Sequence, residues 1–401
     1  MKGKVLLALL YFYALIFSVL KTIRFPNEWS EAHWLIDYRF GFIKRGLAGQ
    51  IFGFFFQKNE FNILLVSAVI LLILYGCIYF IVLKQTNNLS QNIYRVVFYL
   101  VFFLSQYIVL SAHIIGYFDH IVFLLTILII YLIRKNLIFL SSILVCISLL
   151  IHEISFFLTI PISLFALIVA AMSNEKFSFN EVFNLQLLKK SILFLGLPAV
   201  LMFFLSYYQE IYGKENYLSL FNYLKASGFI KKDIADLVAT SYTEKFTYYL
   251  ETESKSFVIK MIYHKSFAFS LPILFLLFIV YKEYQRIGLP LFFLFIIAVL
   301  SPLLLHFVAW DTYRIWAFPY MTMFLGYWIL NVKFKNSTDQ FEQFPVVLMI
   351  ISALVMVFLA ITQPDLFDFE VARFSLIERI LMLIPILAGF GYYIKAPKKI
   401  F

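Results

Sequence analysis

The sequence predicts an all-α integral membrane protein that crosses the bilayer many times. Of its 401 residues, 63% are hydrophobic and only 14% are charged, whereas a soluble domain has about 25% charged residues. The apolar residues also form repeated runs long enough to cross a bilayer, which takes roughly 20 residues of helix. We therefore expect one transmembrane bundle over residues 1–401 rather than separate soluble domains.

The apolar runs predict about 12 transmembrane helices. Two neighbouring runs are short, which fits a tight hairpin or a locally thin bilayer. The first run follows Lys2 and Lys4 as in a secretory signal, but no small-residue cleavage site follows it, so we expect a retained helix. The predicted spans are 4–22, 61–83, 94–112, 120–134, 136–151, 154–172, 191–208, 266–281, 289–308, 315–332, 345–363 and 378–394.

Positive charge predicts the orientation, because Lys and Arg concentrate in cytoplasmic loops. With the N-terminus inside, every inner segment is basic and both termini are cytoplasmic. This distribution accounts for the net charge of +10 without a nucleic-acid partner. The basic inner residues include Lys84, Arg95, Arg134, Lys135, Lys189, Lys190, Lys282, Arg286 and Lys333.

The predicted outer side consists of a first segment at 23–60, a long loop at 209–265 and several short turns. The long loop has apolar residues at helical spacing, so we expect amphipathic interfacial helices there. All six histidines fall on or near this side, which is the strongest functional signal in the sequence. They are His33, His113, His120, His152, His264 and His306.

The first outer segment mixes charges of both signs with aromatic residues and glycines. Asp37 is a candidate to take a proton from an attacking hydroxyl group. Arg39, Lys44 and Arg45 are candidates to bind an anionic leaving group such as a diphosphate, and the glycines allow close backbone approach. Alternatively, the segment is an interfacial helix whose basic side chains reach lipid phosphates.

Two further polar groups interrupt the apolar runs. Asp119 and His120 begin a span and follow His113, so they could bind a sugar hydroxyl, although Asp119 could equally cap the helix. His152-Glu153 lies within the apolar stretch 137–171, where charges are costly and tend to be functional. Such a pair suits proton transfer, or else marks only a turn between two short spans.

A metal site built from Asp119, His120, His152 and Glu153 is an alternative. The spacing does not match a zinc-protease motif, and we expect no cofactor. Asp311 and Arg314 are three residues apart, on one face of a helical turn. They either pair with each other, or Asp311 binds substrate and Arg314 binds a phosphate.

This layout, with Asp37 in a charged first outer segment, resembles bacterial membrane glycosyltransferases of the GT-C type. The Phe- and Ile-rich composition and basic inner loops also resemble O-antigen or capsule repeat-unit polymerases. The GT-C resemblance implies Asp37 as the catalytic base, with Glu28 and Glu31 as rivals. The polymerase resemblance implies outer-facing arginines at the site, for which Arg39, Arg45 and Arg314 are the candidates.

We therefore expect glycan transfer from an undecaprenyl-diphosphate carrier to an acceptor glycan, at the outer face of a bacterial inner membrane. Repeat-unit polymerisation is the first interpretation, with a chain-length regulator as a possible partner protein, and single-sugar transfer is the second. A lipid-linked-glycan flippase or other transporter stays open, although transporters often have charges near the midplane and repeated halves. An acyltransferase with His152 as its base is a weaker alternative.

Overall fold

The computed structural model describes residues 2–87, 92–172, 177, 184–248, 251, 255–309, 311–334, 345–362 and 373–395, without the side chains of 2, 87, 255–268 and 395. This part of the chain is helical and contains no strand, so the predicted all-α class is confirmed for it. The α-helices are α1 (Lys2–Leu20), α2 (Glu28–Leu35), α3 (Gly46–Phe55), α4 (Glu60–Asn87), α5 (Ile93–Phe103), α6 (Gln106–His113), α7 (Asp119–Arg134), α8 (Ile138–Ile151), α9 (Ser155–Ala171), α11 (Leu185–Tyr212), α12 (Tyr217–Ala226), α13 (Lys232–Thr243), α15 (Lys255–Tyr284), α16 (Leu289–Leu300), α17 (Thr312–Lys333), α18 (Val346–Ile361) and α19 (Leu376–Lys395). The 3-10 helices are η1 (Tyr38–Phe40), η2 (Lys214–Asn216), η3 (Gln285–Ile287) and η4 (Ser301–Phe307).

Six helical segments of the described chain are long and apolar enough to cross a membrane. Helices also occupy the other predicted spans, but α7, α8, α9 and α18 are only 14 to 17 residues long. The number of spans therefore stays a prediction. The six segments are 3–20, 60–86, 93–113, 185–212, 289–307 and 376–394.

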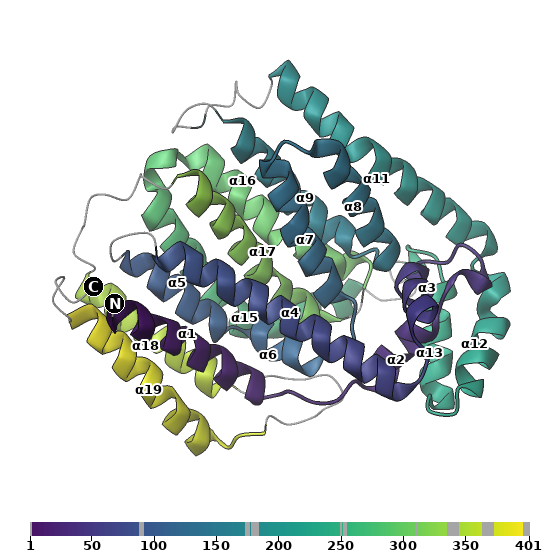
Figure 1. Ribbon diagram of the computed structural model, residues 1–401, viewed down its shortest axis with the longest axis horizontal. Helices are drawn as coiled ribbons and strands as arrows, with labels where there is room; N and C mark the ends of the chain where they lie inside the picture. Colours follow the sequence, from purple (N-terminus) through teal and green to yellow (C-terminus); the bar gives the residue numbers. More distant parts are fainter. Residues whose placement is uncertain are drawn as a thin grey trace.

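Helix α17 lies at the centre of the bundle, in contact with α6, α9, α15 and α16 (Figure 1). Nearly all of its residues from Ile315 to Asn331 are buried, on every side of the helix. A helix that is apolar all round belongs in an interior, so α17 provides a fixed element against which the others pack. Its first turn, which carries Arg314, is thereby held in place.

The short helices α2, α3, α12 and α13 gather at one end of the bundle, whereas the two termini lie at the other end (Figure 1). They share a second apolar core with the ends of α4, α7 and α8, built around Trp34, Ile151, Leu220 and Tyr242. The segments predicted as the first outer segment and the long loop thus pack against each other.

Two predicted spans are irregular in the structure. The span at 94–112 is divided into α5 and α6, because Ser105 takes an extended conformation, with ψ of 160°, and starts a new helix. The span at 289–308 changes after Leu300 into the 3-10 helix η4. Proline 302 in the first turn of η4 lacks the N–H that would continue the α-helical pattern.

Arg95, which the charge pattern assigned to a basic inner loop, is buried in α5. Its Nε donates to Glu283 Oε1 at 2.7 Å, and both side chains are 1% exposed. Asn92 and Tyr327 also donate to this carboxylate. Because its counter-ion is 188 residues away in sequence, the pattern of the local loop could not indicate that Arg95 joins α5 to α15.

Candidate active site

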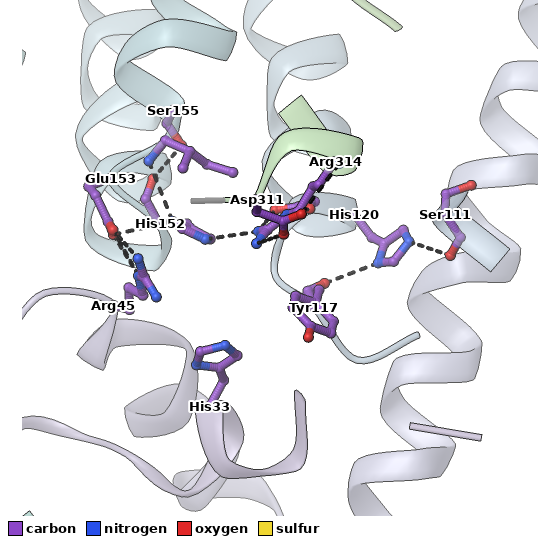
Figure 2. Close-up of polar contacts among 12 residues, drawn as sticks. His33, Arg45, Ser111, Tyr117, His120, His152, Glu153, Ser155, Asp311 and Arg314 are labelled. Atoms are coloured by element: carbon purple, nitrogen blue, oxygen red, sulfur yellow. Dashed lines mark hydrogen bonds and ion pairs between the residues drawn. The ribbon is translucent and has the colours of Figure 1, made fainter. Parts of the chain in front are cut away.

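Arg314 joins three segments that are far apart in the sequence (Figure 2). Its Nε donates to Asp119 Oδ2 at 2.5 Å, and its Nη2 contacts Asp119 Oδ1. The same Nη2 lies 3.1 Å from Nε2 of His152. The start of α7, the turn between α8 and α9, and the first turn of α17 therefore meet at one guanidinium group.

A second buried ion pair continues this network. Arg45 Nε donates to both carboxylate oxygens of Glu153, at 2.9 and 2.8 Å, and its Nη2 contacts Oε1. Nδ1 of His152 lies 3.2 Å from Glu153 Oε2. Asp119, Arg314, His152, Glu153 and Arg45 thus form one continuous polar chain.

Charge interactions within this polar network determine the protonation states of His152 and Glu153. Burial, together with the Arg45 guanidinium, lowers the pKa of His152 to about 4, so its ring is neutral at pH 7. A ring protonated at Nδ1 donates to Glu153 and leaves Nε2 to accept from Arg314. Burial alone would raise the pKa of Glu153, but Arg45 and His152 hold it well below its usual value.

The backbone is strained at Arg45, the residue that follows Lys44. Arg45 adopts a left-handed conformation, with φ of 63°, which costs a non-glycine residue roughly 1 kcal/mol. Helix α3 begins at the next residue and packs closely on the preceding segment. This close packing requires a glycine at Gly49, because a Cβ there would overlap the Ile36 carbonyl oxygen. Strain of this kind is often concentrated at functional sites.

The polar chain borders a cavity of about 570 Å³. The first segment, the α8–α9 turn and the start of α17 contribute charged groups to the lining. The α13 segment contributes both polar and apolar groups, and η4 with the residues after it contributes apolar ones. The polar lining includes His33, Lys44, Arg45, Tyr117, Glu153, Lys231, Ser241, Lys245, Asp311 and Arg314, and the apolar lining includes Ile234, Leu237, Phe246, Leu305, Val308 and Ala309.

Asp37 and Arg39 lie apart from this cavity. Asp37 caps η1, binds Arg39 through both oxygens and accepts from Lys58 Nζ. Burial alone would raise the pKa of Asp37, but these hydrogen bonds hold it below its usual value. Arg39 lies over the ring of Tyr223, with its Cζ 4.9 Å from the ring centre. Neither Asp37 nor Arg39 therefore lines the cavity that contains Lys44, Arg45 and Arg314.

The two histidines near Asp119 also lie outside the large cavity. Nδ1 and Nε2 of His120 lie 3.0 Å from the carbonyl oxygens of Tyr117 and Ser111, so the ring links the end of α6 to the start of α7. His113 is buried in the last turn of α6, where its carbonyl accepts from Arg24 Nε. The side chain of His264 lies outside the described part of the chain.

Several cavity residues were not among the predicted site residues. The His33 ring is surrounded by aromatic side chains, and its Nδ1 lies 2.8 Å from the hydroxyl of Tyr242. Tyr117 lies beneath Arg314, with the guanidinium carbon 5.1 Å from its ring centre. The presence of His33 in a charged outer segment was a usable signal. For Lys231 and Lys245, which flank α13, no local signal existed, because only the docking of α13 places them at the cavity.

Within the described residues, no group of three or more His, Cys, Asp or Glu side chains is placed to hold a metal ion. Comparisons of the chain with protein-family models, with curated proteins and with solved structures found no match.

Proposed function

We propose that the chain transfers a glycan from an undecaprenyl-diphosphate carrier to an acceptor glycan. The observation that carries this proposal is the meeting of Lys44, Arg45 and Arg314 with carboxylates and an apolar wall in one cavity. The reaction would take place at the outer face of a bacterial inner membrane. Repeat-unit polymerisation of O-antigen or capsule is the preferred form, and transfer of a single lipid-linked sugar is the second.

The cationic wall supports diphosphate binding. Lys44 is 6% exposed, and its Nζ donates to the carbonyl of Glu244 at 2.8 Å. Within the described residues no carboxylate lies within ion-pair distance of it, so its charge is available to an anion in the cavity. Burial lowers the pKa of Lys44 to about 8, which still leaves it mostly charged at pH 7. Arg45 and Arg314 add guanidinium groups, which suit the oxygens of a phosphate.

The apolar wall supports a lipid carrier. Leu305 and Val308 line the cavity, while Leu304 and Phe307 of the same η4 segment are 48% and 56% exposed. η4 continues directly from α16, and the two together form one of the segments long and apolar enough to cross a membrane. An isoprenoid tail lying in the bilayer could therefore pass η4 and bring its diphosphate to the cations without crossing a polar surface.

The two acids that pair with the arginines act as positioning residues in this proposal. Asp119 holds Arg314, and Glu153 holds Arg45, so the guanidinium groups are already oriented towards the cavity. Preorganised cations of this kind stabilise a departing diphosphate, because no reorganisation is needed during the reaction. His152 connects the two pairs and fixes their relative placement.

The proposal is tested with the protein in lipid nanodiscs, a fluorescent polyprenyl-diphosphate probe and the Lys44→Ala variant. Loss of one charge-assisted hydrogen bond of about 1.5–3 kcal/mol should weaken probe binding roughly 10- to 150-fold. Lys84→Ala changes an exposed lysine in the last turn of α4 that does not line the cavity; this variant is the control and should bind like the unaltered protein. Equal binding by both variants would count against the diphosphate site.

Gene deletion in the host separates the forms of the proposal. Retention of single repeats with loss of long chains supports a polymerase, and a glycan lacking one sugar supports single-sugar transfer. Accumulation of lipid-linked glycan on the cytoplasmic face would instead indicate a flippase and would overturn the proposed transfer.

A further inference from the structure

The carboxylates around the cavity differ in how tightly they are bound by cations. Asp119 and Glu153 each accept two or more hydrogen bonds from an arginine. Glu28 pairs with Lys231 at 2.6 Å and also accepts its backbone N–H at 2.7 Å. Oxygens engaged in this way are poor proton acceptors, because accepting a proton would break contacts that favour the charged form. Asp233 also lines the cavity, but it is exposed to solvent at the start of α13.

Asp311 is held more loosely. It precedes α17 and lines the cavity. Its oxygens lie 3.4 Å from the backbone nitrogen of Arg314 and 3.6 Å from its Nη1, both longer than the roughly 2.8 Å of a strong charge-assisted hydrogen bond. The side chain is 20% exposed, compared with 3% for Asp119, so a ligand in the cavity can reach it.

We infer that Asp311 is the general base of the proposed glycosyl transfer. The inference rests on the proposed function and assigns the proton transfer within that site. Asp311 takes the proton of the acceptor hydroxyl while the hydroxyl oxygen forms its bond to the anomeric carbon. The bond from that carbon to the diphosphate oxygen breaks, and the diphosphate leaves with the electron pair, held by Lys44, Arg45 and Arg314.

The electrostatic surroundings agree with this role. Burial raises the pKa of Asp311 to about 7, with Arg314 of its own helix opposing the shift and Asp119 of α7 adding to it. His152, from the α8–α9 turn, faces the same guanidinium and is neutral. A base works best when its pKa is near the working pH. Because the base must be deprotonated, the transfer rate should rise with pH up to about 7. It should fall again above about pH 8, where Lys44 loses the charge that holds the diphosphate.

Asp311→Asn tests the assignment without removing the helix cap, since Asn caps a helix about as well as Asp. In nanodiscs with a lipid-linked glycan donor and a glycan acceptor, this variant should transfer roughly 10²- to 10⁴-fold more slowly. Binding of the polyprenyl-diphosphate probe should stay within a few-fold of that of the unaltered protein. Asp311→Glu should recover part of the rate. Asp236→Asn, on the exposed face of α13, is the matched control and should transfer normally.

The outcomes separate this assignment from the function on which it rests. If Asp311→Asn transfers within tenfold of the unaltered protein and keeps its pH profile, Asp311 is not the base, while the glycosyltransferase proposal stands. If the unaltered protein neither binds the probe nor transfers glycan, the proposed function and the assignment are both overturned.

Discussion

Replacement of Arg314 by Ala should destabilise the protein more than any surface change, because it leaves Asp119 without its counter-ion. The Asp119 side chain is 3% exposed and receives contacts from Nε and Nη2 of Arg314. Breaking a buried ion pair by removing one partner costs about 3–5 kcal/mol. We therefore expect the free energy of unfolding of Arg314→Ala to fall by about 3–5 kcal/mol.

The assay is a double-mutant cycle with Asp119→Asn, measured as the free energy of unfolding by denaturant titration in detergent micelles. Removing the second charge relieves the buried anion, so the double variant should be more stable than Arg314→Ala alone. Groups in direct contact couple by about 0.5–3 kcal/mol, and the bidentate geometry predicts a value at the upper end. Arg314→Lys keeps the charge but loses the planar fork, so its stability should lie between those of the unaltered protein and Arg314→Ala.

Additive effects of the two substitutions would refute this reasoning, since they would mean that Arg314 and Asp119 do not interact. A normal stability for Arg314→Ala would refute it as well. The same variants separate stability from binding. Asp119→Asn keeps the cation and should reduce probe affinity less than Arg314→Ala, which removes it.

Three further predictions concern residues outside the cavity. Asp37→Asn should lower the unfolding free energy by about 1–3 kcal/mol but leave the transfer rate per folded molecule unchanged; a large loss of rate in folded protein would restore Asp37 as a catalytic candidate. Gly49→Ala should lower the melting temperature, because its Cβ would overlap a backbone carbonyl, whereas Gly76→Ala in α4, with open space around it, should not; equal melting temperatures would contradict the close packing of α3. Arg95→Met should cost about 3–5 kcal/mol in denaturant titrations and Arg95→Met with Glu283→Met much less, and additive losses would show that their pairing is unimportant.

The sequence predicts the helices well because membrane-spanning segments are long apolar runs interrupted by charges. Each predicted span overlaps helix in the described chain, although the spans at 94–112 and 289–308 are irregular. The break at Ser105 was missed, because no Gly or Pro marks it. The paired state of Arg95 was missed for a different reason, since a charge near the end of an apolar run looks the same whether it faces water or a distant carboxylate.

The site was predictable where a polar group interrupts an apolar run on the expected side. Asp119, His152 and Arg314 were found in this way and meet in the structure. Asp37 was selected from the charges of the first outer segment and then by resemblance. Its binding to Lys58, which lies 21 residues further along the chain, could not be predicted from the spacing of residues. The contribution of α13 depends on how two amphipathic segments dock, which periodicity does not determine.

The pairing of charges itself indicates which residues are free to engage a substrate. Buried charges need partners, since desolvation costs several kcal/mol for each ion, and Arg45 and Arg314 are matched by Glu153 and Asp119. These four residues therefore maintain the shape of the site whether or not a ligand is bound. Among the charged cavity residues that are not exposed to solvent, two are bound less completely: Lys44, which contacts a backbone carbonyl, and Asp311, whose contacts are long. One is a cation and the other a carboxylate, as a reaction needs when it releases a diphosphate and removes a proton from a hydroxyl group.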